Sequence, residues 1–283
     1  MSTEAPVPLL LVDGHHLLYR AHFGFPKRFE ALDGTDVTGA FGFSALLRKH
    51  HRELCPGHEV IVVFDAEDGA AARARADAGY KATRASADHS PIQALAPLKR
   101  MLDLARVRWV EVPGAEGDDV LASLAWRAVA DGRPVVALSG DRDLYGLLTG
   151  PGVRILSPQA PPGRQFVTAS TVMERYGVTP GQWADFRALT GDPADNLPGV
   201  PGIGPVTAAR LLAGGRRLED LPLTAAGRLA KPLARTRACW DDVMRWRSLH
   251  LLNTGITCRA PLTGRATGEL PTPADLMKAA GLW

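Results

Sequence analysis

The sequence predicts an α/β protein in which a mostly parallel central sheet is flanked by helices and is followed by a helical C-terminal region. Three short apolar runs rich in β-branched residues lie at Pro8–Val12, Val60–Phe64 and Val135–Leu138, and helix-like stretches separate them. Such runs are typical of strands that are buried on both faces of a parallel sheet. From about Thr168 onward the pattern becomes helical.

Each of the three predicted strands is followed by an aspartate. Asp13 and Asp65 come directly after the first two strands, and Asp141 follows shortly after the third. Ligands of an open α/β sheet bind outside the carboxyl ends of its strands. We therefore expect these three side chains to converge on one crevice, although they are far apart in the sequence.

The segment after the second strand, from Glu67 to Ser90, is rich in Ala and Arg and has no apolar stripe that matches its arginines. It contains Arg73, Arg75, Tyr80, Lys81 and Arg84. Two interpretations remain open at this point. The segment is either a solvent-exposed connecting helix, which is the usual fate of such a sequence, or a basic arch over the site.

The rest of the chain divides into a loop and a series of helices. Pro151–Gly163 is rich in Pro and Gly and is predicted as a loop. Helices are predicted at Ser170–Tyr176, Trp183–Leu189 and Thr207–Leu212. We therefore place an α/β core at residues 1–166, with the arch segment at about 67–95, and a helical region at residues 167–283.

The composition describes an ordinary folded protein. The chain has 283 residues, of which 46% are apolar and 22% are charged. It has no apolar run of the roughly 20 residues that a membrane-spanning helix needs, and its N-terminus lacks the pattern of a signal peptide. We expect a cytoplasmic protein without a membrane partner. The widely spaced Cys55, Cys239 and Cys258 predict neither a disulfide framework nor a zinc site.

Further carboxylates occur in three clusters. They are Glu116, Asp118 and Asp119 at the start of a predicted helix, Asp141 and Asp143 after the third strand, and Asp192 and Asp195 before a glycine-rich hinge. Helix capping explains one or two acids in the first cluster, and single Asp pairs are common in turns. Together with Asp13 and Asp65, however, they form an oxygen donor set for hard divalent ions, and two ions about 3.5–4 Å apart can clamp the attacking and leaving oxygens of a phosphodiester.

The charge balance agrees with such a site. The formal net charge is only +3, from 33 Lys and Arg against 30 Asp and Glu. If the nine carboxylates above share one cavity, the other acids are well outnumbered, so a basic surface surrounds an acidic pocket. That arrangement suits a metal-using nuclease. Arginine richness also has a neutral explanation in base composition, so charge alone does not identify a nucleic-acid partner.

The stretch from Asp195 to Ala209 is the most specific in the chain. Its glycines, Gly199, Gly202 and Gly204, allow close backbone approach, and the helix that follows begins with N–H groups that suit a phosphate. A hairpin between helices that grips the DNA backbone is therefore predicted. A nucleotide-binding loop is a poor alternative, because no G-x-x-x-x-G-K-[ST] motif is present and no strand precedes the glycines.

These motifs resemble those of the 5′ nuclease, or flap endonuclease, family, in particular the bacterial branch that occurs as the N-terminal domain of DNA polymerase I and as free-standing enzymes. The resemblance runs from Leu9 to about Leu212, through VDGHHLLYR, VVFDA, YKATR, EGDDV, SGDRDL and GDPADNLPGVPGIG. It implies a nuclease domain with a helical arch, catalysis with Mg²⁺ or Mn²⁺, and a helix-two-turn-helix DNA clamp at about 190–215 that often holds a K⁺ ion.

The resemblance also implies a role for individual residues. Four acids resemble the ligands of one metal position: Asp13, Asp65, Glu116 and Asp118. Asp118 also extends to a second position, whose other acids are Asp141, Asp143, Asp192 and Asp195, while Asp119 is auxiliary. Lys81 and Arg84 resemble catalytic cations at the arch base, and Arg73 resembles a further arch contact with DNA. The implied DNA contacts of the clamp are Gly199, Gly202, Ile203 and Gly204.

One position departs from the family pattern. Lysine is common in the family where Val206 stands in GIGPVTA. A phosphate contact of the clamp is therefore missing here, which predicts weaker affinity for the duplex although the backbone amides remain.

The expected function is that of a monomeric structure-specific 5′ nuclease, active as a 5′ flap endonuclease and 5′-3′ exonuclease in replication or repair. Its expected substrates are DNA with 5′ flaps, 5′ overhangs or nicks, and 5′ strands that contain RNA, which places its action at the nucleoid. The chief alternative is a non-catalytic DNA-binding relative, but such relatives lose acids of the second metal position that are retained here. A PIN-like ribonuclease shares the acidic pocket but lacks the glycine clamp.

Overall fold

The computed structural model describes residues 5–83, 87–258 and 262–283, and it contains a six-stranded sheet with the order β3-β2-β1-β4-β5-β6. The strands are β1 (Leu9–Asp13), β2 (Glu59–Phe64), β3 (Arg108–Glu111), β4 (Val135–Leu138), β5 (Val153–Leu156) and β6 (Phe166–Val167). All neighbouring pairs are parallel except β5 with the edge strand β6. The order reverses between β1 and β4, so the crevice of this sheet opens where these two strands end.

The central strands are continuous apolar runs because both faces of the sheet are covered. Leu9 and Leu11 belong to the core on one face, and Leu10 and Val12 belong to the core on the other. The first face is covered by α5 (Gly117–Ala130) and by the helical region. The second face is covered by α1 (Gly14–Gly24), α2 (Thr38–Leu54), α4 (Leu95–Leu104) and α11 (Pro273–Ala279).

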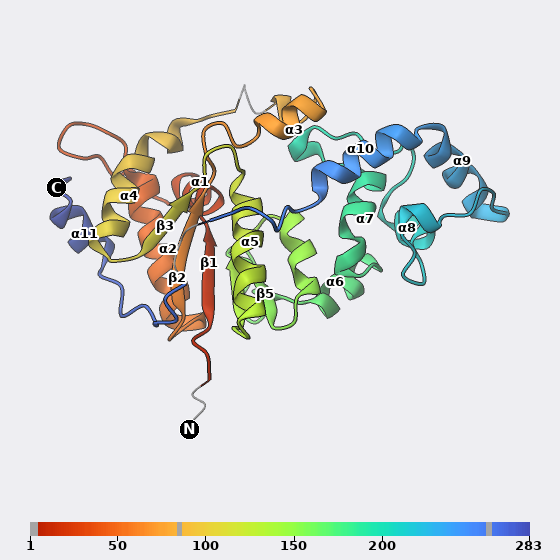
Figure 1. The fold of residues 1–283 in the computed structure, drawn as a ribbon. Helices are drawn as coiled ribbons and strands as arrows, with labels where there is room; N and C mark the ends of the chain where they lie inside the picture. The colour runs from red at the N-terminus through yellow and green to blue at the C-terminus, as the bar shows by residue number, and fades with distance from the viewer. Residues whose placement is uncertain (1–4, 84–86, 259–261) are drawn as a thin grey trace.

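The helical region lies beyond the β5 side of the sheet (Figure 1). Its helices are α6 (Ala169–Tyr176), α7 (Trp183–Thr190), α8 (Pro205–Leu211), α9 (Ala230–Ala238) and α10 (Trp240–His250). Trp183 is almost fully buried between the rings of Tyr145, Tyr176 and Phe186, which joins α6 and α7 to the core. No described helix is long and apolar enough to cross a membrane.

The predicted fold class is confirmed, with one correction. The three predicted strands correspond to β1, β2 and β4, and the three predicted helices correspond to α6, α7 and α8. The prediction of a loop across Pro151–Gly163 was wrong, because β5 lies inside it. In this strand, Val153, Ile155 and Leu156 are buried, and the strand pairs in parallel with β4. Burial and pairing stabilise the strand although Pro and Gly residues flank it.

The predicted arch segment holds little regular helix among its described residues. It contains the six-residue α3 (Ala71–Ala76) and a 3₁₀ helix at Ser90–Ala94. Arg84 lies outside the described residues. In Figure 1, α3 sits above the sheet, close to α10.

The C-terminal segment returns from the helical region to the α/β core, which Figure 1 shows as a blue trace crossing toward α11. The division at residue 166 stays a prediction, and the structure adds that the last residues pack on the core. The indole of Trp283 lies against the rings of Phe29 and Phe41.

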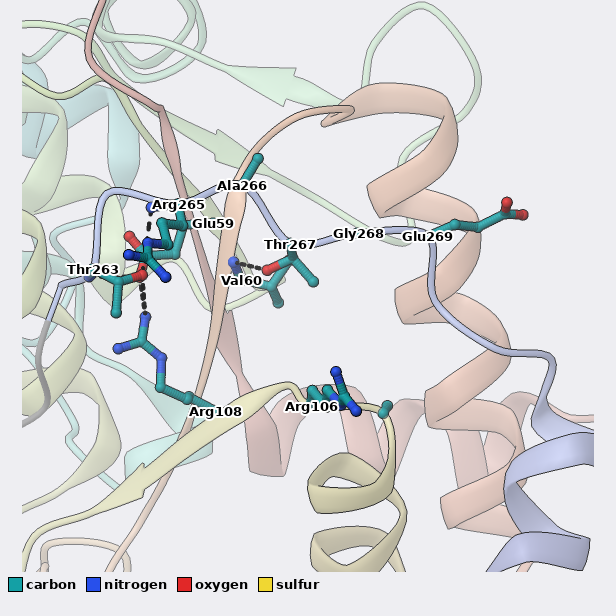
Figure 2. A pocket seen from close by; sticks show the side chains of 11 residues that line it. Glu59, Val60, Arg106, Arg108, Thr263, Arg265, Ala266, Thr267, Gly268 and Glu269 are labelled. Carbon is teal, nitrogen blue, oxygen red and sulfur yellow. Dashed lines mark hydrogen bonds and ion pairs between the residues drawn. The ribbon is translucent and has the colours of Figure 1, made fainter.

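A buried carboxylate fastens this returning segment. Glu59, at the start of β2, pairs with Arg108 and with Arg133, whose Nη2 lies 2.6 Å from Glu59 Oε2. Glu59 also accepts hydrogen bonds from the backbone N–H groups of Thr263 and Gly264, at 2.8 and 3.0 Å. Figure 2 shows this anchor beside a cavity of about 620 Å³.

We expect Glu59→Gln to lower the free energy of unfolding by about 3 kcal/mol, because it leaves Arg133 buried without its counter-charge. Urea denaturation measures the change. Glu269→Gln is the matched control: Glu269 pairs with Arg48 at the surface and its side chain is 78% exposed, so its loss should cost less than about 1 kcal/mol. Equal effects of the two substitutions would contradict the anchor.

Candidate active site

Asp13 stands at the end of β1, where the strand order reverses. Its carboxylate accepts a hydrogen bond from the N–H of His16 at 3.0 Å, so it caps α1. The hydroxyl of Ser139, which follows β4, donates to the other oxygen of Asp13 at 2.7 Å. The adjacent ends of β1 and β4 are thereby joined through a carboxylate that faces the crevice.

Four of the predicted metal ligands line one cavity. Its volume is about 410 Å³, and Asp13, Asp65, Asp118 and Asp141 all contribute to its wall, together with Lys81. Asp65 is fixed there by the N–H of Gly117, which donates to it at 2.6 Å. The structure thus brings together three acids that follow strands and one acid from the first turn of α5.

The negative charges in this cavity are poorly compensated by protein groups. Burial raises the pKa of Asp118 well above its ordinary value, and the nearby Asp141, Asp13 and Asp65 raise it further. Burial, followed by the charge of Asp143, raises the pKa of Asp141 to about 6. Like charges this close require bound cations or protons. The carboxylate oxygens of these four acids therefore fit hard divalent cations that keep part of their water.

Glu116 has a different environment from these four acids. Its carboxylate is buried and pairs with Lys81 and with Arg73, whose Nη1 lies 2.7 Å from Glu116 Oε1. The hydroxyl of Tyr80 donates to the same carboxylate at 3.2 Å. Burial alone would raise the pKa of Glu116, but the two cations lower it below its ordinary value. The charge of Glu116 is therefore neutralised within the protein.

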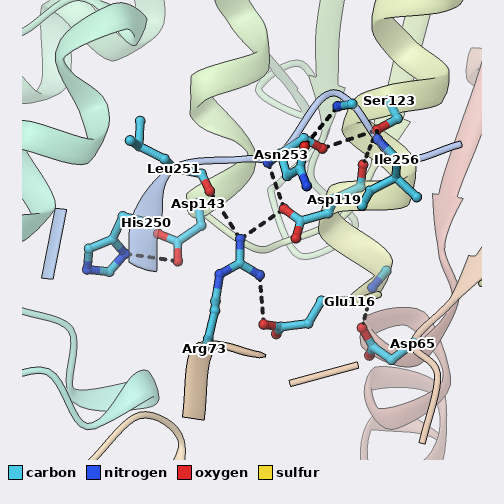
Figure 3. Close-up of polar contacts among 12 residues, drawn as sticks. Asp65, Arg73, Glu116, Asp119, Ser123, Asp143, His250, Leu251, Asn253 and Ile256 are labelled. Carbon is cyan, nitrogen blue, oxygen red and sulfur yellow. Dashed lines mark hydrogen bonds and ion pairs between the residues drawn. The ribbon is translucent and has the colours of Figure 1, made fainter. Parts of the chain in front are cut away.

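Asp119 is also held by protein contacts. One of its oxygens accepts hydrogen bonds from Arg73 Nη2 at 2.9 Å and from the N–H of Asn253 at 2.8 Å. Arg73 further donates to the carbonyl oxygen of Leu251 at 3.1 Å. Figure 3 shows the guanidinium between Glu116, Asp119 and this carbonyl. These contacts link the arch segment to α5 and to the residues that follow α10, while the predicted contact of Arg73 with DNA stays a prediction.

A second acidic cluster lies deeper in the protein. Among the described residues, Asp143, Asp192 and His250 place one ligand atom each within 4.8 Å of one another. Arg187 pairs with both acids, at 3.4 Å from Nε to Asp143 Oδ1 and at closer range to Asp192. Sequence reasoning did not identify Arg187 or His250. His250 lies 107 residues from Asp143 in the sequence, so no local pattern connects them.

The predicted clamp is tied directly to the arch base. The N–H of Lys81 donates to the carbonyl oxygen of Asp195 at 2.9 Å. The amide Nδ2 of Asn196 donates to the carbonyl oxygen of Gly79, also at 2.9 Å. Asp195 itself is buried. Through these two bonds, the position of Lys81 depends on the hairpin that follows α7.

Glycines shape that hairpin as the sequence suggests. A Cβ at Gly199 would lie 2.3 Å from the backbone nitrogen of Gly191, so a side chain there is excluded. Gly202 has a positive φ of 76°, and Gly204 precedes α8. Ile203 is buried and its N–H donates to the carbonyl oxygen of Val200 at 3.0 Å. That amide is therefore not free for a phosphate.

In metal-free protein, we expect Asp141→Asn to stabilise the fold above about pH 6 and to have little effect near pH 4. The folded-state pKa of Asp141 is about 6 against an ordinary 3.8, so the stability that this group contributes is complete below the lower value and is lost as the pH rises through the higher one. Asparagine stays neutral and still accepts the bond that the N–H of Asp143 donates at 2.9 Å.

The gain at neutral pH should be on the order of 1–3 kcal/mol, measured by urea denaturation in the presence of a chelator. Asp131→Asn, at the far end of α5, is the control and should show no such pH dependence. A variant that is no more stable than the native protein at neutral pH would contradict the crowding of charge described above.

Comparisons with known proteins identify relatives of this chain. Residues 8–177 match the family model for the 5′-3′ exonuclease, N-terminal resolvase-like domain, and residues 178–268 match that for the 5′-3′ exonuclease, C-terminal SAM fold. The chain is 45% identical over 213 residues to thermostable DNA polymerase I of Thermus aquaticus, and 35% identical over 222 residues to DNA polymerase I of Mycobacterium bovis. These matches cover 75% and 77% of this chain but only 24% of each relative.

Solved structures share the fold. The T5 5′-exonuclease with bound divalent metal ions (zinc) has a TM-score of 0.68 and 22% identity, over 87% of this chain and 90% of that one. The catalytic core of Rad2 in complex with DNA substrate has a TM-score of 0.65 and 14% identity, over 99% of this chain and 89% of that one. With family models that match nearly the whole of the described core and helical region, the chain belongs to the 5′-3′ exonuclease family.

Proposed function

We propose that this chain is a divalent-metal-dependent 5′ nuclease that hydrolyses phosphodiesters at 5′ flaps, 5′ overhangs and nicks in DNA, and in 5′ strands that contain RNA. The observation that carries the proposal is the cavity in which Asp13, Asp65, Asp118 and Asp141 face one another without enough protein cations to balance them. The T5 5′-exonuclease with bound metal ions and the DNA complex of Rad2 support the same chemistry for this fold.

The cavity acids would hold Mg²⁺ or Mn²⁺. When bound, such ions supply a water nucleophile at neutral pH and polarise the phosphodiester. The protein supplies the orientation: Asp13 is fixed by Ser139, and Asp65 is fixed by the N–H of Gly117. Because these acids are set by strand ends and a helix start, the donor set is organised before a substrate arrives.

Lys81 supplies a positive charge beside this donor set. Its ammonium lines the cavity and pairs with Glu116, and its side chain is only 15% exposed. Burial alone would lower the pKa of Lys81, but Tyr80, Glu116 and Asp195 raise it above its ordinary value. The group therefore stays protonated at neutral pH. It is placed to offset the charge that develops on a phosphate during hydrolysis.

Cleavage of a set of 5′-labelled substrates tests the proposal. Flap, overhang, nicked and fully duplex DNA, with all-DNA or RNA-containing 5′ strands, are compared in Mg²⁺ and in Mn²⁺. We expect products with 5′-phosphate and 3′-hydroxyl ends from the flap and nick substrates. Asp118→Asn should abolish cleavage, and Asp131→Asn, directly after the same helix, should retain it. Binding without cleavage in either metal would favour a non-catalytic DNA-binding protein.

Lys81→Ala should lower the single-turnover rate of flap cleavage by at least tenfold while flap affinity changes little, because a cation near the reacting phosphate contributes most in the transition state. Asp141→Ala should also abolish cleavage, but through loss of metal affinity. Raising Mn²⁺ should partly restore the Asp141 variant and should not restore the Lys81 variant.

The matched control for this comparison is Lys99→Ala. Lys99 pairs with Glu111 at 2.5 Å on the opposite side of β2 from β1. Neither residue lines the cavity, so the variant tests the loss of a lysine–glutamate pair outside it. If Lys81→Ala changes the rate by no more than about twofold, well below 1 kcal/mol, Lys81 has no role in the reaction.

A further inference from the structure

A second cavity lies at the end of β2 that is remote from the catalytic cavity. Its volume is about 620 Å³, and its wall is formed by the starts of β2 and β3 and by residues 263–269 of the returning segment (Figure 2). Glu59 begins β2 and Asp65 follows its last residue, so the two ends are about 20 Å apart at about 3.3 Å per residue. No residue of the catalytic cavity lines this one.

The two acids of this cavity are already balanced by arginines. Glu59 pairs with both Arg108 and Arg133. Glu269 pairs with Arg48, whose Nη2 lies 3.1 Å from Glu269 Oε1. Burial, followed by the charge of Arg133, lowers the pKa of Arg108 below its ordinary value, so the single charge of Glu59 does not neutralise both arginines. These acids therefore leave no negative charge for a further cation of the wall.

Two further arginines line the same cavity. Arg106 belongs to the turn between α4 and β3, and Arg265 belongs to the returning segment. In the part of the chain that the structure describes, neither guanidinium makes a hydrogen bond or an ion pair. A guanidinium donates N–H bonds in a planar fork that matches the oxygens of a phosphate group. The cavity thus offers at least two positive charges to an anion.

Arg106 occupies a backbone conformation in which glycine is the usual residue. Its φ is 56°, in the left-handed region. Its N–H donates to the carbonyl oxygen of Asp103 at 3.0 Å, and the N–H of Val107 donates to that of Leu102 at 2.9 Å, which ends α4. Glycine is more stable than other residues at such a helix end. Helix termination therefore does not explain the arginine, whose side chain lines the cavity instead.

We propose that this cavity binds a free anion with two or more phosphate groups, either inorganic or as the phosphate chain of a nucleotide. Its volume lies within the range of small-ligand sites, about 300–1,000 Å³. Among the described residues, no aromatic side chain lines it, so the phosphate groups rather than a base are recognised. The site goes beyond the proposed nuclease function, because it lies at the other end of the sheet from the catalytic cavity.

Calorimetric titration with sodium pyrophosphate, on DNA-free protein from which metal has been removed, tests the site. The expected result is one saturable site per chain, whose affinity falls at least about tenfold in Arg106→Gly and in Arg265→Ala. Arg100→Ala is the matched control and should change the affinity little, because Arg100 is an exposed residue of α4 that does not line the cavity. Absence of saturable binding, or an equal loss in Arg100→Ala, would overturn the proposal.

Thermal unfolding supplies a second readout that separates binding from folding. Without ligand, Arg106→Gly should unfold at the same temperature as the native protein or at a higher one, because glycine suits the left-handed position. Pyrophosphate should raise the unfolding temperature of the native protein but not that of the variant, because a ligand stabilises only the form that binds it. An equal rise in both proteins would contradict the role of Arg106.

Competition experiments distinguish the sources of phosphate. A nucleoside diphosphate that displaces pyrophosphate identifies a nucleotide as a ligand, and one that does not identifies the inorganic anion; both outcomes support the site. Displacement by flap DNA would assign these arginines to the duplex and overturn the proposal. Arg106→Gly should cleave flap DNA at the native rate, so failure of the proposed nuclease activity would appear separately, with pyrophosphate binding intact.

Discussion

The mutual repulsion of buried carboxylates is the constraint on which the rest of this structure depends. Parallel pairing of β1 with β2 and β4 brings the carboxyl ends of three strands to one edge, and each end supplies an aspartate. In low dielectric, such a group of charges is unfavourable unless cations or protons balance it. The arch segment, α7 and α10 all approach this edge. The arch segment brings Arg73 and Lys81 to it, α7 brings Arg187, and α10 brings His250.

Six of the nine acids fall into two classes that differ in how their charge is balanced. Glu116 and Asp119 are neutralised by Arg73 and Lys81, so they hold the arch segment onto α5 and help to position these cations. The four acids of the first cavity are not neutralised by protein cations in this way. The pKa values of Asp118 and Asp141 are therefore raised above their ordinary values. A carboxylate whose pKa is raised in the folded protein is the kind that a bound cation stabilises most. The sequence alone does not separate these two classes, because they follow from three-dimensional proximity.

Much of the fold and part of the site could be predicted because the signals are local. The strands before Asp13 and Asp65 are buried on both faces and therefore appear as continuous apolar runs. By contrast, β3 is a partly exposed edge-side strand of four residues and β5 lies between glycines and prolines, so only their pairing reveals them. Three functional contacts join residues that are far apart in the sequence. Glu59 and Arg133 are 74 residues apart, Arg187 and Asp143 are 44 apart, and His250 and Asp143 are 107 apart. No periodic pattern in the sequence indicates such contacts.

Two hydrogen bonds connect the hairpin of the predicted DNA clamp to the arch base that carries Lys81. Lys81 has a positive φ of 54°, a conformation that costs a non-glycine residue on the order of 1 kcal/mol. Its N–H bond to Asp195 and the bond from Asn196 to Gly79 hold it there. Asn196 is also left-handed, with a φ of 58°. Because both residues are held by the same pair of contacts, the backbone position of Lys81 depends on the position of the hairpin. The predicted DNA clamp and the placement of this cation are therefore parts of one structural unit.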